Sequence, residues 1–266
     1  YTGKSTLLQM WGHFILSNFL QQLLCHVKES DEIILIDDAC NIFDTLVFLD
    51  NMANKYKQIR LIHLKQKVGF GKANNIGISI ANGETIIFIN TDIFLESKCI
   101  DRMLDLLWSS KKIGAVQPLL VYPQTNKVQS TGHVFSDYRS GQLFSMRKIQ
   151  DVVLQQNGIR QALTMALCAV KSNVIEEIGG FDEYYYNSHE GLELSLKITL
   201  NGYNCCFCSN AIAYHCSGGA RKTALNDISK QKAHFYHKWY NSIQVRAVKS
   251  AQLISPGERR KLCKPW

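Results

Sequence analysis

Four short apolar segments, separated by helical patterns, restrict the fold of this chain more than any other feature of its sequence. They have the length and isoleucine content of buried strands and lie at residues 31–38, 59–64, 84–92 and 114–122. Helical periodicity is found between them, at residues 42–57, 72–82 and 97–110. Because strands that alternate with helices form a mostly parallel sheet covered on both faces, the pattern predicts an α/β fold.

Carboxylates stand at the ends of two of these strands. Asp37 and Asp38 end the first, and Asp92 ends the third. In an open α/β sheet a ligand binds beyond the carboxyl ends of the strands, so the three acids are predicted to lie at a ligand-binding edge. The structural alternatives are a helix cap for Asp38 and a turn residue for Asp92.

The second half of the chain is less regular. Turns and short strands are expected over residues 123–160, with an exposed loop at 137–142. The elements predicted after them are a strand at 162–170, helices at 171–180 and 189–202, a strand at 204–215, and a basic amphipathic helix from Asn226 to about Lys249.

The composition is that of a globular protein with a basic surface. Hydrophobic residues make up 46% of the 266 residues, and no apolar stretch reaches the ~20 residues of a membrane span. The net charge of +8 suits phosphate-bearing ligands, nucleic acid or anionic lipid. No signal peptide is expected, and a start at Tyr1 instead of Met indicates a piece of a longer protein.

Nine cysteines are spread through apolar runs without the spacing of a disulfide framework. Free thiols in a reducing compartment are expected, which favours the cytoplasm. Zinc is an alternative, because Cys205 and Cys208 have a Cys-x-x-Cys spacing near His215 and Cys216. No clean second pair completes that motif, so buried free cysteines are preferred.

The stretch GKST, at residues 3–6, matches the tail of a phosphate-binding P-loop. The full motif needs an earlier glycine and a preceding strand, which would lie before residue 1. A polar helix start with Thr2 or Ser5 as the cap is the preferred interpretation, and an NTPase fragment is the weaker alternative.

Six motifs occur in an order that resembles the family 2 glycosyltransferases. They are ILIDDAC (34–40), KVGFGKANNIGI (67–78), FINTD (88–92), GGFDE (179–183), HEGLELSLK (189–197) and AYHCSGG (213–219). The resemblance covers about residues 1–220 and implies the GT-A fold with its first strand cut short, Tyr1 and Thr2 forming the tail of that strand. It also implies an enzyme that moves a sugar from a nucleoside diphosphate sugar to an acceptor hydroxyl, by an inverting, metal-dependent route.

The resemblance further implies which residues bind the donor. Its nucleotide-sugar contacts map to Tyr1, Asp37, Asp38, Gly69, Lys72, Asn74, Asn75, Asn90 and Arg221. Asp92 and His215 map to the ligands of a divalent metal, Mg²⁺ or Mn²⁺. A solvated lysine is an equal alternative for Lys72, and a structural histidine is the alternative for His215.

The position of the general base departs from the family pattern. The family shows Glu-Asp-x-Asp-Leu where this chain has Glu-Gly-x-Glu-Leu, so Gly191 stands at the usual base position. Glu190 is the first candidate for the base, and His189 is the second. A homologue that binds the sugar nucleotide without turnover is the alternative function. The structural alternative for Glu193 is a surface pair with Lys197.

The remaining predictions concern organisation and partners. A GT-A domain is expected over residues 1–222 and a basic helical extension over 223–266. A glycan or lipid-linked acceptor is expected, because residues 114–135 resemble family members that build surface polysaccharide, including rhamnosyltransferases. Contact with an anionic membrane at its inner face suits the basic tail, and no nucleic-acid-binding module is found. The tail's basic residues are Arg259, Arg260, Lys261 and Lys264.

Overall fold

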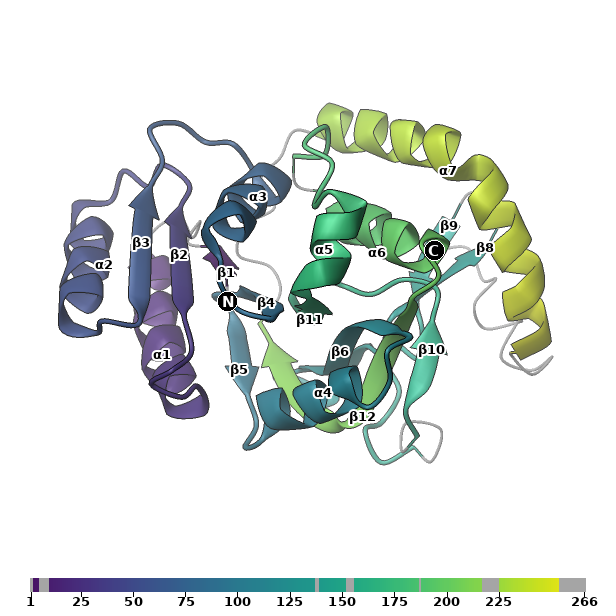
Figure 1. Cartoon of the computed structure of the whole chain (residues 1–266), viewed down its shortest axis with the longest axis horizontal. Helices are drawn as coiled ribbons and strands as arrows, with labels where there is room; N and C mark the ends of the chain where they lie inside the picture. The colour runs from purple at the N-terminus through teal and green to yellow at the C-terminus, as the bar shows by residue number, and fades with distance from the viewer. Residues whose placement is uncertain are drawn as a thin grey trace.

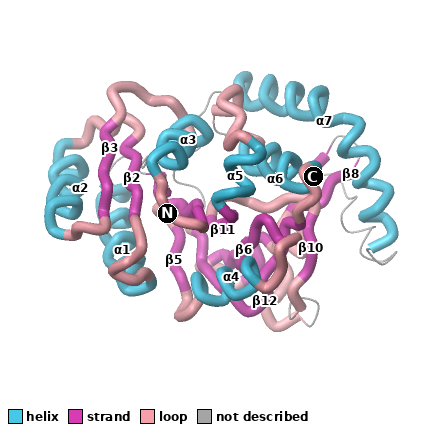
Figure 2. The backbone as a smooth tube through the Cα atoms, in the orientation of Figure 1, coloured by secondary structure: helices cyan, strands magenta, loops and turns pink. Residues whose placement is uncertain are grey.

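The computed structural model describes residues 2–4, 10–136, 139–151, 156–186, 188–216 and 225–253 of the chain. A mixed β-sheet runs through the molecule (Figure 1). Helices lie on both sides of it (Figure 2). The predicted α/β architecture is confirmed.

The N-terminal half forms the parallel part of the sheet. Its strands are β1 (Thr2–Lys4), β2 (Ile33–Asp37), β3 (Ile59–His63) and β4 (Thr85–Asn90). Its helices are α1 (Met10–His26), α2 (Phe43–Lys55) and α3 (Phe70–Ile80). β1 lies between β2 and β4 and pairs in parallel with both, while β3 pairs with the other side of β2. The three strands predicted in this half are therefore confirmed.

The C-terminal half adds antiparallel strands. Its elements are β5 (Ile93–Leu95), α4 (Cys99–Trp108), β6 (Ile113–Tyr122), β7 (Lys127–Ser130), β10 (Gly158–Arg160), β11 (Leu167–Lys171), α5 (Ser172–Ile178), α6 (Glu190–Leu200) and β12 (Asn204–His215). β11 pairs antiparallel with β4 and β6, and β12 runs parallel to β6. The strand order is β10-β12-β6-β11-β4-β1-β2-β3, with β5 beside β12 and β7 beside β6.

Alternate residues of the central strands point to opposite faces of the sheet and build two cores. On β4, Ile87 and Ile89 pack in a cluster with residues of α1 and α4. The intervening Ile86 and Phe88 pack with residues of α5 and α6 on the other face. Because both faces are covered, these strands are apolar at nearly every position, which is why they were visible in the sequence.

A two-stranded sheet corrects one prediction. β8 (His133–Ser136) pairs antiparallel with β9 (Arg139–Gln142). The predicted exposed loop at 137–142 is therefore wrong for residues 139–142. Ser140 and Gly141 have low strand propensity, so the pairing with β8 forms this strand, not the local preference of its residues.

The long helix α7 (Leu225–Leu253) lies along the outside of the C-terminal half (Figure 1). Its Phe235, Tyr236 and Ile243 are buried in one cluster with Phe135 of β8 and Leu196 of α6. The helix predicted from Asn226 to about Lys249 is confirmed. The predicted domain boundary after residue 222 falls outside the described residues, as does the basic tail from Arg259.

Gly3 and Lys4 lie in β1, although a helix start was predicted for this stretch. Both residues pair with β2 and with β4, and α1 begins only at Met10. The helix-start interpretation is wrong here because the sheet offers partners on both sides of the segment. A P-loop would need these residues in a loop, while the fold expected from the resemblance has a short first strand at this place.

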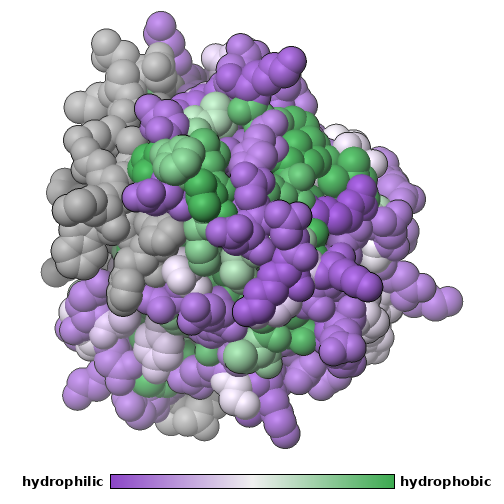
Figure 3. Space-filling model, turned by 90° about the vertical axis from the view of Figure 1, so that its left-hand side faces the viewer, coloured by the Kyte–Doolittle hydropathy of each residue, from purple (hydrophilic) through white to green (hydrophobic). Residues whose placement is uncertain are grey.

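The edge of the molecule at α2 and β3 mixes apolar and polar side chains (Figure 3). Phe43 and Val47 of α2 are exposed, Phe43 by 75%.

Among the helices of the described ranges, none is both long enough and apolar enough to cross a membrane.

Candidate functional site

The parallel strands β2 and β4 end at the same edge of the sheet, with β1 between them. Asp37 ends β2, Asn90 ends β4, and Asp92 lies two residues further on. His215 ends β12, and the next residue, Cys216, donates its backbone N–H to the Asp92 carbonyl at 3.0 Å. Predicted site residues from three strands therefore meet at one edge.

Asp92 and His215 form the central contact of this edge. The Nε2 atom of His215 lies 3.2 Å from Oδ1 of Asp92, and both side chains are mostly buried. On the other side of the ring, Nδ1 lies 2.6 Å from Oε1 of Gln129 in β7. Because a carbonyl oxygen only accepts, Nδ1 carries the proton and donates it to Gln129. The lone pair on Nε2 of a neutral His215 then faces the carboxylate.

Two acceptors that face each other need a cation between them, either a proton on Nε2 or a metal ion. The residues fit a divalent metal, since neutral imidazole and carboxylate are both common ligands and Gln129 fixes the required tautomer. The buried Oδ1 of Asn90 accepts no hydrogen bond from the described residues, which leaves an acceptor at the same edge. The described ranges contain no cluster of three His, Cys, Asp or Glu ligands, so a metal would need ligands from donor and water.

Asp37 is buried and held by two protein donors. Its Oδ1 accepts the Cys40 N–H at 2.9 Å, and its Oδ2 lies 2.8 Å from Nδ1 of His63. The other ring nitrogen of His63 lies 3.2 Å from Oδ1 of Asp50 in α2. These carboxylates, with the hydrogen bond to Asp37 as the main cause, raise the pKa of His63. A carboxylate has about four lone-pair positions, so Asp37 keeps acceptor capacity for a ligand.

Asp38 ties the end of β2 to the loop before α3. Its two oxygens accept the N–H groups of Val68 and Gly69, at 2.6 and 3.2 Å. The alternative that Asp38 caps the helix beginning near residue 42 is wrong, since the start of α2 has no side-chain cap bond. Gly69 has a φ of +83°, and a Cβ there would lie 2.5 Å from the Tyr186 carbonyl oxygen. Only glycine fits this position.

The polar residues of α3 fasten the GGFDE segment. Asn75 exchanges two hydrogen bonds of 2.9 Å with the backbone of Phe181. Lys72 pairs with Glu183 at 3.2 Å, and both side chains are about half exposed. Asn74 is buried and donates to the first turn of its own helix. The predicted contacts of these three residues with a donor stay predictions.

The start of α6 lies next to the end of β4. Glu190 is the first residue of the helix and is only 6% exposed. A Cβ at Gly191 would lie 2.9 Å from Cγ of Met165. The next residue, Ala166, accepts the Asn90 N–H at 2.8 Å. Met165 and Ala166 therefore place the start of α6, and Glu190 with it, near the edge that holds Asn90.

His189 precedes α6 in a left-handed conformation (φ 70°). Its Nδ1 lies 2.6 Å from Oγ of Ser188, and its ring centroid lies 5.1 Å from that of Phe235. Burial, with a smaller effect of Lys232, lowers the pKa of His189 to about 4. A base of that pKa is a weaker proton acceptor than one tuned near neutral pH.

Glu193 is fully buried, so its predicted place on the helix surface is wrong. Its Oε2 lies 3.5 Å from Nζ of Lys197, and its Oε1 lies 3.1 Å from Nζ of Lys238 in α7. Lys238 also pairs with Asp182 at 2.6 Å. The surface interpretation failed because α7, 45 residues further along the chain, covers this face of α6.

Two predicted site residues, Tyr1 and Arg221, lie outside the described residues. The cysteines of the described ranges are free thiols. Burial raises the pKa of Cys206 to about 11, and it also raises that of Cys208, which favours protonated thiols in β12. The zinc alternative therefore gains no support.

Sequence reasoning did not find Gln129, His63 or Met165. Each contacts a predicted site residue from a distant segment, as Gln129 and His215 do across 86 positions of the chain. None of the three belongs to a motif, so no pattern in the sequence marks them. Only the tertiary fold brings these three residues to the site.

Comparisons with known proteins agree with this arrangement. A sequence model described as "Glycosyl transferase family 2" matches residues 16–173. Glycosyltransferase GlyG of Streptococcus pneumoniae is 26% identical over 146 residues, which are 52% of this chain and 44% of that protein. The chain thus spans less than half the length of this curated relative.

Solved structures share the fold. The structure of GalNAc-T7 with UDP, GalNAc and Mn²⁺ has a TM-score of 0.73 at 16% identity, over 91% of this chain and 49% of that one. Mannosyltransferase PcManGT from Pyrobaculum calidifontis, in complex with GDP-Man and Mn²⁺, has a TM-score of 0.60 at 15% identity, over 97% and 65%. The predicted GT-A fold is confirmed.

Proposed function

Since the chain belongs to glycosyltransferase family 2, we propose that it transfers a sugar from a nucleoside diphosphate sugar to an acceptor hydroxyl. The observation that carries the proposal is the contact between Asp92 and His215, at the strand edge that also holds Asp37 and Asn90. The nucleotide and Mn²⁺ in the structures of GalNAc-T7 and PcManGT support the same ligand classes here.

Asp92 and His215 are the proposed protein ligands of a divalent ion, Mg²⁺ or Mn²⁺. When bound, such an ion supplies Lewis-acid stabilisation of the charge on a departing diphosphate. Gln129 holds the His215 ring with Nε2 toward Asp92. Asp37 would accept a hydrogen bond from the base or ribose, in a position fixed by His63 and Cys40.

Glu190 is the proposed general base. Its carboxylate takes the proton of the acceptor hydroxyl as the hydroxyl oxygen bonds to the anomeric carbon. The bond from that carbon to the diphosphate oxygen breaks on the opposite side, so the configuration inverts. The burial of Glu190 limits the water that surrounds it and strengthens electrostatic interactions at the site.

A second candidate function is binding of a sugar nucleotide without turnover. It is favoured by one observation, that Met165 fills the space beside Gly191, where the family carries its usual base. In that case the strand edge would keep its donor site, and Glu190 would have only a structural role.

The proposed acceptor is a glycan or a lipid-linked glycan, in surface polysaccharide synthesis on the cytoplasmic side of a membrane. The resemblance of residues 114–135 to polysaccharide-building family members supports this, and the net charge of +8 suits an anionic membrane surface.

Donor binding is tested by thermal unfolding with UDP-, GDP- and dTDP-sugars, with and without Mn²⁺. Ligand binding raises the apparent stability of the folded state, so one donor class should give a Mn²⁺-dependent increase in Tm. Asp92→Ala should abolish that increase, while the control Asp101→Ala, on the exposed side of α4, should keep it. Unaltered binding by Asp92→Ala would contradict the proposal.

Turnover separates the two candidate functions. Glu190→Gln should retain donor binding but lose sugar transfer and donor hydrolysis by at least about 100-fold, the usual range for a general base. His189→Asn serves as the matched control and should keep most of the activity. Donor binding without turnover in the wild-type chain would favour the non-catalytic candidate.

A further inference from the structure

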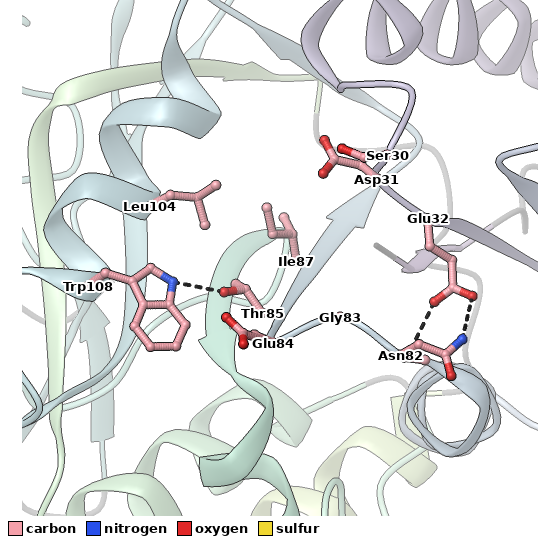
Figure 4. Close-up of a pocket in the computed structure, with 11 residues that line it drawn as sticks. Ser30, Asp31, Glu32, Asn82, Gly83, Glu84, Thr85, Ile87, Leu104 and Trp108 are labelled. Carbon is pink, nitrogen blue, oxygen red and sulfur yellow. Dashed lines mark hydrogen bonds between the residues drawn. The ribbon is translucent and has the colours of Figure 1, made fainter.

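A cavity of about 410 Å³ lies at the opposite edge of the sheet from Asp92 and His215. Its walls come from α4, from the turn before β2 and from the turn before β4 (Figure 4). Thr85 begins β4 and lines the cavity, whereas Asn90 ends that strand at the proposed donor site. At ~3.3 Å per residue, the two positions are roughly 17 Å apart. The cavity is therefore separate from the donor site.

Trp108 is the aromatic residue that lines this cavity. Half of its surface is exposed (50%), which is unusual for so large an apolar side chain. Its Nε1 donates to Oγ1 of Thr85 at 3.1 Å, which fixes the indole (Figure 4). The ammonium of the buried Lys171 lies 4.9 Å from the ring centroid and donates to the Ser110 carbonyl. Since Lys171 covers one face from within, the exposed surface of the indole is its other face.

The ionisable side chains that line the cavity are carboxylates. Asp31, Glu32 and Glu84 line the cavity together with Asn82, and no basic side chain of the described ranges does so. Asn82 donates two hydrogen bonds to Glu32, at 3.0 and 3.1 Å, and Arg60 pairs with the same carboxylate. These contacts hold Glu32 in place and balance its charge.

From these contacts we propose that the cavity is a second carbohydrate-binding site, which takes a neutral oligosaccharide. An immobile aromatic face flanked by carboxylate acceptors suits the apolar ring face and the hydroxyl donors of a sugar. A second cation on the indole is disfavoured, because the ammonium of Lys171 already lies against its other face. The volume is within the range of small-molecule sites.

The inference rests on the proposed function in one respect, the identity of the bound chain as part of a glycan acceptor. Holding a glycan at a second site raises the local concentration of its reactive end at the donor site. The site would therefore favour long acceptors over short ones.

The test uses an array of immobilised neutral, amino and acidic oligosaccharides, probed with the purified full chain. The wild-type chain should bind neutral glycans, and Trp108→Ala should weaken the best of them by about tenfold or more. Trp108→Phe keeps an aromatic face and should bind within about threefold of wild type. Glu84→Gln keeps an acceptor but removes the charge, so binding of a neutral sugar should also stay within about threefold. Thermal unfolding checks that each variant is folded.

Asp92→Ala separates this inference from the proposed function. It should lose Mn²⁺-dependent donor binding and keep glycan binding, whereas Trp108→Ala should do the reverse. The inference is overturned if no neutral glycan binds, if Trp108→Ala binds as well as wild type, if only amino sugars bind and Glu84→Gln abolishes that binding, or if Asp92→Ala loses glycan binding while Trp108→Ala keeps it. Absence of donor binding in all variants would overturn the proposed function instead.

Discussion

Met165 occupies the space that a side chain at Gly191 would need. A Cβ there would lie 2.9 Å from Met165 Cγ and 3.3 Å from its backbone nitrogen, and Met165 is only 4% exposed. If Gly191 stands at the family's base position, as the resemblance implies, the absence of that base is coupled to the packing of a second residue. Restoring an aspartate by one substitution would not restore the geometry of the family.

We expect Gly191→Asp to lower the free energy of unfolding by about 1–3 kcal/mol, the usual cost of overpacking, without raising activity. An acid near a helix N-terminus is otherwise favourable, so a net loss in urea denaturation reports the clash. Met165→Ala is itself destabilising, but Gly191→Asp should cost less in a Met165→Ala background than in the wild-type background. Equal stability of Gly191→Asp and wild type would show that the segment relaxes freely.

His63 gives the site a dependence on pH that can be measured. Its pKa is raised, chiefly by the hydrogen bond to Asp37, with Asp50 as the second carboxylate that faces it. The folded state therefore holds this proton more tightly than the unfolded state, where the pKa is about 6.5. The stabilisation is complete below about pH 6.5 and is lost as the pH rises through the folded pKa of His63.

The difference in unfolding free energy between wild type and His63→Gln should accordingly shrink from pH 6 to pH 9. Urea titrations at several pH values measure it. A difference that stays constant with pH would mean that the ion pairs of His63 contribute nothing.

At the scale of elements, Lys238 makes the charged contacts that hold α7 against α6 and the segment before it. Lys238 bridges Asp182 and the fully buried Glu193, beside the apolar contacts of Phe235 and Tyr236. Removing it leaves a buried carboxylate with only the longer contact to Lys197. That contact alone compensates the buried charge poorly.

Lys238→Met should therefore destabilise the chain by about 1–3 kcal/mol, less than for a fully enclosed pair because the lysine is partly exposed. Lys232→Met, at an exposed position on the same helix, is the matched control and should change little. If both variants unfold at the same urea concentration, the bridge does not stabilise the docking of α7.

The elements that the sequence predicted well are those whose apolar pattern follows from burial. β2, β4 and β12 match their predicted segments closely, because strands buried on both faces need apolar residues throughout. β9 was missed, because its partner strand determines it and its own composition does not. β1 was misjudged as a helix start for a related reason, since its three residues carry too little apolar pattern to mark a strand.

At the scale of the whole molecule, two half-buried histidines oppose folding in acid. His133 is half-buried, and desolvation of its ring, with a smaller effect of His189, lowers the pKa of His133 to about 4. The pKa of His189 is lowered to about 4 as well, mainly by burial. Below pH 6.5 the unfolded chain binds protons that the folded chain does not. Stability should therefore fall as the pH decreases from 6.5 toward 4.

Urea unfolding between pH 6.5 and 5, above the ordinary range of carboxyl pKa values, isolates this effect. His133→Gln should flatten the slope in that window relative to wild type. The same slope in both proteins would show that His133 is not kept neutral by the fold.

The site residues that belong to motifs could be predicted from the sequence. The residues that only hold those side chains in position could not. Asp37, Asn90, Asp92 and His215 stand at strand ends that apolar patterning marks. Gln129, which decides the tautomer of His215, stands in a short hairpin strand without any such mark. Motifs mark the side chains proposed to bind ligands. The residues that orient those side chains, such as Gln129, are brought to them by the tertiary structure.

The three-residue strand β1 also works as a spacer. Neighbouring strands lie ~4.8 Å apart, so β2 and β4, on either side of it, are about 10 Å apart. Under the proposed roles, this width separates the anchor of the nucleoside, Asp37, from the anchor of the diphosphate, Asp92 with His215. The spacing of the strands would then select for the length of the donor. A nucleoside monophosphate, which is one phosphate shorter, would contact only one of these two anchors.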